Sequence, residues 1–169
     1  MGKSIDFEKL VAAYGHDLYR FAFWLSHDQH GAEDLVQETF LRAWRNFRQL
    51  RDAASVKSWL LTTLRREYYR RRPPAEVCNL EDELLIAESE RFEVRQDVDV
   101  AIEIEQRLSA LPTSYREVLV LQLLFGYSTQ EIASIVDTTE AAVANRLLRA
   151  RRSLRTGAVL AVCSRRRAP

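Results

Sequence analysis

The stretch "STQEIASIVDTTEAAVANRLLRAR", residues 128–151, joins a short apolar segment, a break at "VDTT" and a second segment rich in arginine. This pattern predicts two abutting short helices separated by a tight turn. Ala133 supplies the small residue that close packing of two helices requires, and apolar residues stand on both sides of the break. The second helix then either lies in a DNA groove or forms a solvated face of a helical bundle.

The turn and the outward residues of the second helix carry the DNA-binding hypothesis. Asp137 stands where the turn needs a left-handed backbone, and Thr138 or Thr139 is placed to cap the second helix. Arginine can pair with guanine, asparagine with adenine, glutamate with cytosine, and any basic residue with phosphate. The residues expected to point outward are Glu140, Asn145, Arg146 and Arg149.

Composition favours an all-α fold. The chain has 169 residues, of which 47% are hydrophobic, and only 5 Gly and 4 Pro. It is long enough for one domain or two small ones with packed cores, and it lacks the Val/Ile/Thr alternation of strands. No apolar run approaches the roughly 20 residues of a membrane span, and the N-terminus shows no signal-peptide pattern. The two cysteines, Cys78 and Cys163, are read as incidental thiols of a cytosolic protein.

Charge divides the chain into three blocks. Residues 1–72 carry 13 Lys+Arg against 9 Asp+Glu, residues 73–105 carry 2 against 11, and residues 106–169 carry 10 against 4. Basic blocks suit polyanions such as nucleic acid. The acidic block between them is read first as a solvated linker.

Apolar periodicity predicts three helices in the first block, at about 5–26, 30–47 and 55–71. Ser55 is the expected N-cap of the third helix, which Pro73 and Pro74 end.

Helical periodicity resumes at about residue 98. Pro112 is expected at the first position of the next helix, and Gly126 just past its end. The two short helices of the opening stretch follow.

Several motifs together resemble bacterial sigma factors, specifically the extracytoplasmic-function (ECF) group. In the second half, Leu111-Pro112, Arg116, "EIA" at 131–133 and "RAR" at 149–151 match the C-terminal, region 4 domain of that family. In the first half, "AEDLVQETFLRAWRNF" resembles its polymerase-binding helix and "SWLLTTLRREYYRRR" its promoter −10 helix. The resemblance covers about residues 7–72 and 98–155.

The resemblance implies two small helical domains joined by an acidic linker. Residues 1–73 would form region 2, a helical bundle that binds core polymerase and recognises and melts the −10 element. Residues 74–97 would be the linker, which in the family threads the active-site and RNA-exit channel. Residues 98–160 would form region 4 with the helix-turn-helix for the −35 element, and residues 161–169 a basic tail.

The family resemblance also implies which residues bind core polymerase and DNA. Exposed carboxylates repel phosphate, so the second helix suits a protein partner. Its expected contacts with core polymerase are Asp34, Gln37, Glu38 and Arg42. Leu35, Phe40, Leu41 and Trp44 flank them and are read mostly as core residues.

In the third helix and the loop before it, arginines would hold single-strand phosphates and tyrosines would stack on unpaired bases. Packing against the first helix is the equally weighted alternative for both tyrosines. The expected −10 contacts are Arg48, Arg51, Lys57, Arg65, Arg66, Tyr68, Tyr69 and Arg70, with Ser55 and Ser58 as further candidates for a base pocket. The expected −35 contacts are Thr139, Glu140, Asn145, Arg146, Arg149 and Arg152.

The function implied is a cytoplasmic sigma factor that directs core RNA polymerase to double- and single-stranded promoter DNA. An anti-sigma factor is a partner implied by the family, and any membrane contact would run through it. No catalytic set, cofactor motif or metal site is evident; His27 and His30 are read as loop histidines in solvent. The alternatives are a self-standing helix-turn-helix operator-binding regulator and a helical protein without DNA contact.

Overall fold

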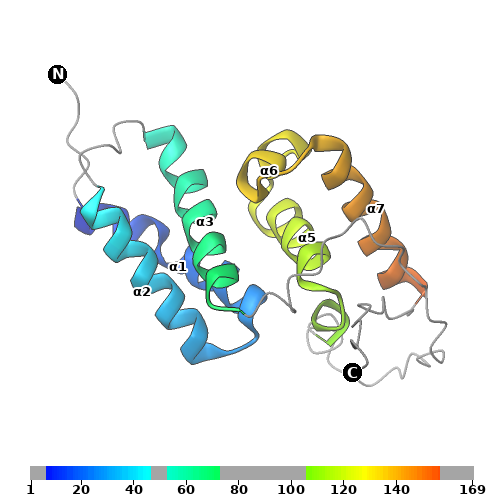
Figure 1. Ribbon diagram of the computed structural model, residues 1–169, viewed down its shortest axis with the longest axis horizontal. Helices are drawn as coiled ribbons and strands as arrows, with labels where there is room; N and C mark the ends of the chain where they lie inside the picture. The colour runs from blue at the N-terminus through cyan, green and yellow to red at the C-terminus, as the bar shows by residue number, and fades with distance from the viewer. Residues whose placement is uncertain (1–6, 47–52, 73–105, 157–169) are drawn as a thin grey trace, which may run out of the picture.

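The computed structural model describes residues 7–46, 53–72 and 106–156, and in these ranges it forms helices and no strand. The first bundle consists of α1 (Phe7–Ser26), α2 (Gln29–Arg45) and α3 (Ala53–Arg70). The second contains α5 (Thr113–Phe125), α6 (Thr129–Val136) and α7 (Glu140–Thr156), preceded by a helical turn at 106–109. The two bundles lie side by side (Figure 1). The prediction of an all-α chain with two helical bundles is therefore confirmed.

The core of the first bundle is built from apolar residues spaced three or four apart. Leu18, Phe21 and Leu25 of α1 and Leu60 and Leu64 of α3 are all at most 1% exposed. This spacing places them on one face of each helix, and removal of that face from water drives the packing.

The buried line of α2 differs, because it consists mainly of small residues: Ala32, Leu35, Thr39 and Ala43. Small side chains let α2 approach its neighbours closely and leave its bulkier apolar residues at the sides of the contact.

Two helix starts depart from prediction. The helix α3 begins at Ala53, so Ser55 lies inside its first turn and the prediction that Ser55 is the N-cap is wrong. Ala53 and Ala54 are strong helix formers and extend the helix to that point. Pro112 is the N-cap of α5 rather than its first residue, with extended backbone at φ −53° and ψ 142°. Gly126 ends α5 in the left-handed conformation (φ 71°), as predicted.

Parts of the predicted organisation fall outside the described ranges. The acidic linker at 74–97, the first part of the predicted helical pattern at 98–105 and the basic tail at 161–169 all do so, whereas the helical turn at 106–109 falls within that pattern. Among the residues that the structure describes, no helix is long and apolar enough to cross a membrane.

The two bundles contact each other through an apolar centre. Phe21 of α1 and Phe125 of α5 pack edge to face with ring centroids 6.2 Å apart. The ammonium group of Lys57 on α3 lies 5.2 Å from the centroid of the same Phe125 ring. The side chain of Phe125, at the end of α5, therefore contacts both α1 and α3 of the neighbouring bundle.

Candidate functional site

The helix-turn-helix of α6 and α7 has the predicted construction. Ser128 and Glu131 form a capping box in which the Glu131 backbone N–H donates to Ser128 Oγ (3.3 Å) and the Ser128 backbone N–H donates to Glu131 Oε2 (2.8 Å). Asp137 has φ 55° and ψ 58°, the left-handed turn expected of it. Thr139 Oγ1 accepts from the Ala142 backbone N–H at 3.2 Å and caps α7. Ala133 is 8% exposed and lies against the core as predicted.

The outer face of α7 presents part of the predicted −35 set to solvent. Asn145, Arg149 and Arg152 are exposed. Glu140 is also exposed, and its carboxylate accepts from the Thr129 hydroxyl at 2.8 Å. Arg146 differs, because its side chain is only 16% exposed and its Nη1 lies 3.9 Å from Glu117 Oε1 of α5. The structure thus brings together an exposed basic face and turns one predicted DNA contact inward.

Two of the predicted −10 residues face the second bundle from α3. Arg65 donates from Nε to Glu117 Oε2 (2.8 Å) and from Nη2 to Glu117 Oε1 (3.1 Å). The Tyr69 hydroxyl donates to Glu117 Oε2 at 3.2 Å, and the Arg65 guanidinium lies over the Tyr69 ring at 4.7 Å from its centroid. The side chain of Glu117 is fully buried, at 0% exposed. One buried carboxylate therefore holds groups from both bundles.

These contacts shift the pKa values of the groups around Glu117. Burial alone would lower the pKa of Arg65, but the Glu117 carboxylate outweighs it and raises that pKa. Burial first, and the Glu117 charge second, raise the pKa of Tyr69. Arg65 is therefore charged and Tyr69 neutral at physiological pH, which lets both donate to the carboxylate.

Among the remaining predicted −10 residues, some are exposed to solvent and others contact the rest of the protein. Arg66 is 67% exposed, with Asp137 at 3.8 Å. Lys57 forms an ion pair with Asp17 at 2.6 Å. Tyr68 is only 3% exposed, so the packing alternative describes it and its ring is not presented to bases in this conformation. Arg48 and Arg51 lie outside the described residues.

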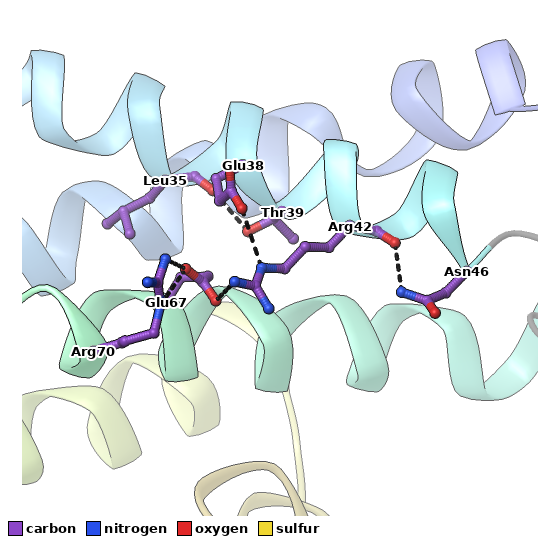
Figure 2. A network of polar contacts seen from close by, with 7 residues as sticks. All are labelled: Leu35, Glu38, Thr39, Arg42, Asn46, Glu67 and Arg70. Carbon is purple, nitrogen blue, oxygen red and sulfur yellow. Dashed lines mark hydrogen bonds and ion pairs between the residues drawn. The ribbon is translucent and has the colours of Figure 1, made fainter.

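Figure 2 shows a polar network between α2 and α3 that holds three more of the predicted residues. The carboxylate of Glu67, whose side chain is 3% exposed, forms ion pairs with Arg42 Nη2 at 2.7 Å and with Arg70 Nη2 at 2.6 Å. Arg42 Nε also donates to Glu38 Oε1 at 3.2 Å. The predicted polymerase contacts Glu38 and Arg42 and the predicted −10 contact Arg70 thus belong to one network that joins the helices, whereas Asp34 and Gln37 are exposed.

The apolar flank of α2 is only partly core. Leu35 is 3% exposed and Phe40 is partly buried, as predicted, but Leu41 is 45% and Trp44 60% exposed. The core prediction for Leu41 and Trp44 is wrong, because the small residues of α2 form its buried line and leave these two at the side. The ring of Phe7 packs edge to face on Trp44, with centroids 4.8 Å apart. A large apolar surface on one helix beside exposed polar residues is typical of a protein-binding site.

Comparisons with known proteins agree with this arrangement. The Sigma-70 region 2 family matches residues 10–72 and the Sigma-70 region 4 family matches residues 101–154. The ECF RNA polymerase sigma factor SigM of Bacillus subtilis (strain 168) is 32% identical over 152 residues, 88% of this chain and 92% of that protein. The chain belongs to the ECF sigma factors.

Solved structures show the same fold in related proteins. The sigma factor RpoE of Bartonella quintana, in complex with the anti-sigma factor NepR, has 29% identity and a TM-score of 0.68, covering 89% of this chain and 94% of that one. CnrH, in complex with the cytosolic domain of CnrY, has 26% identity and a TM-score of 0.62, covering 88% and 84%. The family resemblance read from the sequence is therefore confirmed.

In this ECF sigma factor, sequence reasoning did not predict the role of two charged residues that organise the contact between bundles. Glu117 is one and Arg116 is the other, and both interrupt an otherwise apolar segment of α5. Arg116 is 4% exposed and donates from Nε to Trp24 O (2.6 Å) and from Nη2 to Leu25 O (3.2 Å). Two adjacent charges within an apolar run were the available signal, but a sequence does not show which partners meet them.

Proposed function

We propose that the two domains of this ECF sigma factor bind different partners during transcription initiation. The first domain, residues 1–73, binds core RNA polymerase and the −10 element, and residues 98–160 bind the −35 element. Residues 74–97 connect them, and residues 161–169 form a basic tail. The observation that carries the proposal is the exposed face of α7 with Asn145, Arg149 and Arg152, on a helix whose first turn is capped by Thr139.

The polymerase-binding surface is proposed to combine the exposed polar and apolar residues of α2. Asp34 and Gln37 supply polar contacts, and Leu41 and Trp44 supply apolar area. Glu38 and Arg42 take part through the network that fixes α2 on α3. Aromatic side chains with neighbouring polar groups are frequent hot spots of protein interfaces, which supports Trp44 as the anchor.

The −10 surface is proposed to lie on α3 and the loop before it. Arg66 and Arg70 are the exposed cations of α3 that suit single-strand phosphates. Arg48, Arg51, Lys57, Arg65 and Tyr69 complete the proposed set, and Arg65 and Tyr69 take part once they leave Glu117. Tyr68 stays in the set only if its ring leaves the core.

The partners extend to an anti-sigma factor. RpoE of Bartonella quintana is in complex with the anti-sigma factor NepR, and CnrH with the cytosolic domain of CnrY. We infer a comparable partner for this chain. It would act in the cytoplasm, where core polymerase and promoter DNA are found, as an initiation subunit without catalytic activity of its own.

Co-elution with core polymerase tests this assignment. Purified chain mixed with bacterial core RNA polymerase should elute from a sizing column as one complex. Trp44→Ala should weaken the complex by about tenfold or more, as expected for a hot-spot aromatic residue. The matched control is Phe23→Ala, which removes a partly buried aromatic side chain of α1 that contacts Tyr19 and Trp24, and it should keep core affinity if the fold is intact. Failure of the unmodified chain to co-elute, with DNA binding retained, would favour an operator-binding regulator.

A further inference from the structure

The helix α7 has an acidic start and a basic end. Residues 140–145 contain one glutamate and no lysine or arginine, whereas residues 146–155 contain five arginines. Figure 1 shows α7 starting beside α6 and leading away from it. In a helix-turn-helix, the N-terminal residues of the second helix reach base edges in the major groove. The basic end therefore suits phosphates, and the carboxylate at the start, which phosphates repel, has to serve a different contact.

Glu140 is the first residue of α7, and the first residue of α6 holds its side chain. The Thr129 hydroxyl donates to Glu140 Oε1 at 2.8 Å. Glu140 is exposed, and the residues that the structure describes form neither an ion pair with it nor a hydrogen bond to its other oxygen, Oε2. One oxygen is therefore fixed by the protein, and the other can accept from a donor outside it.

The surroundings of Glu140 leave room for a base pair to come close. Ala141 and Ala144 are exposed, and their methyl side chains do not hold the helix away from the floor of a groove. Thr139 caps the helix through the Ala142 backbone N–H, so the first turn of α7 has a defined conformation. The position of the Glu140 carboxylate is therefore set by α6, by the cap and by short neighbours.

A carboxylate fixed in the major groove discriminates between the bases. Cytosine presents its N4 amino group as a donor, and a glutamate accepts from it. Guanine and thymine present acceptors, which repel a carboxylate, and adenine places the N7 acceptor beside its N6 donor. Specificity arises from such repulsion against the wrong partner as well as from attraction to the right one. Cytosine is therefore the base that this carboxylate suits best.

We propose that Glu140 reads a cytosine in the −35 element and that Thr129 is the positioning residue that aims its carboxylate. This inference rests on the proposed binding of α7 to the −35 element. The hydrogen bond from Thr129 orders the Glu140 side chain before DNA arrives, which lowers the entropy lost on binding. Without the hydroxyl the carboxylate turns more freely, and its discrimination between bases falls.

Selection from a duplex library tests the role of Glu140. The full-length chain with core RNA polymerase would be mixed with duplexes whose central segment is fully random, and the bound sequences would be read after several rounds. The unmodified chain should enrich a motif with a cytosine that is preferred about tenfold over other bases. Glu140→Gln should change that one position to adenine, because an amide pairs with adenine N6 and N7.

Thr129→Val tests the positioning role, because it keeps the shape of the side chain and removes the hydroxyl. It should lower the preference for cytosine at the same position to about twofold, and Thr129→Ser should restore it. Thr138→Val is the matched control, since the Thr138 hydroxyl forms no hydrogen bond with the described residues, and it should leave the motif unchanged. Thermal unfolding verifies that each variant keeps its fold.

The outcomes separate base reading from a structural role. A motif that is the same in Glu140→Gln and the unmodified chain would overturn the reading of cytosine, even if Glu140→Gln bound all sequences more weakly. A full preference for cytosine in Thr129→Val would overturn the positioning role. Failure of the proposed function would differ from both, because the unmodified chain would then bind core polymerase and enrich no motif at all.

Discussion

At the scale of single residues, Arg116 shows how a charged group becomes structural. Its guanidinium donates to backbone oxygens of Trp24 and Leu25 at the end of α1 and to Ser109 O and Leu111 O in its own bundle. The last carbonyls of a helix lack partners within the helix and carry its negative dipole end, so a buried cation there is favourable. Burial lowers the pKa of Arg116, but the fixed acceptors keep a donor group in place.

Arg116→Met should lower the free energy of unfolding by about 3 kcal/mol, because it leaves several buried carbonyls without a donor. Urea unfolding followed by circular dichroism measures the change. Arg71→Met, at an exposed position at the end of α3, is the control and should stay within about 0.5 kcal/mol of the unmodified chain. A small effect of both substitutions would mean that Arg116 does not hold the bundles together.

The sequence predicts a solvent-exposed His27, but the residue is partly buried, and this burial makes the stability of the fold depend on pH. Burial, Arg116 and Arg72 lower the pKa of its ring, in that order, and its Nδ1 lies 3.4 Å from Ser109 Oγ of the second bundle. The unfolded chain therefore binds a proton at His27 near pH 6.5, where the folded chain does not. Stability from this residue is present above about pH 6.5 and falls as the pH drops below that value.

His27→Asn should flatten the loss of stability between pH 7.5 and pH 5, and asparagine tolerates the left-handed backbone (φ 52°) of this position. Unfolding midpoints across this range measure the effect. His30→Asn, whose imidazole is 92% exposed, should leave the pH profile as it is. An equal loss of stability in His27→Asn and the unmodified chain would exclude His27 as the source.

At the scale of elements, local signals predict the helices well and their docking poorly. Apolar spacing gives α1, α2 and α3 to within about two residues, and Asp137, Thr139 and Gly126 take the turn and cap roles expected of them. These features depend on a few neighbours in the chain.

The identity of the exposed residues depends on distant partners and could not be predicted as well. The sequence predicts Trp44 as a core residue, but the small residues of α2 form its buried line and Trp44 is 60% exposed. The sequence predicts Arg65 and Arg146 as DNA contacts, but both lie within 4 Å of the buried Glu117 carboxylate. A sequence shows which residues are charged or apolar, but not which surfaces of two bundles meet.

The capping box of α6 leads to a prediction about the stability of that helix. Ser128→Ala should cost about 1 kcal/mol of stability, because the first turn of this short helix loses its side-chain acceptor and its hydroxyl contact with Glu131. Thermal unfolding measures it. Ser134→Ala, a substitution in the interior of the same helix, is the control and should be neutral or slightly stabilising. Equal changes in stability in Ser128→Ala and Ser134→Ala would show that Ser128 does not stabilise α6 as its cap.

The proposed role of α7 in binding the −35 element leads to a prediction about DNA affinity. In complex with core polymerase, Arg149→Gln should weaken binding to a promoter duplex by about tenfold, and it should lower the salt slope by about 1 if the side chain holds a phosphate. Fluorescence anisotropy over a salt series gives both values. Arg155→Gln, exposed at the end of the same helix, should change neither strongly. An unchanged affinity in Arg149→Gln would place the DNA contact elsewhere on the helix.

At the scale of the whole molecule, the fold brings together two parts of the chain that are far apart in the sequence. In the sequence, an acidic block separates two basic blocks. In the structure, these two basic blocks contact each other through Glu117, Arg116 and Phe125. A sigma factor has to reach two promoter elements at once.

Promoter-directed initiation tests the central claim most directly. Core RNA polymerase would transcribe a library of bacterial genomic fragments with and without this chain, and the 5′ ends of the transcripts would be mapped. The account predicts new 5′ ends that depend on the chain, share two conserved upstream elements, and disappear when Arg149→Gln and Arg66→Gln are combined. New transcripts without shared elements, or none at all from a chain that binds core polymerase, would contradict it.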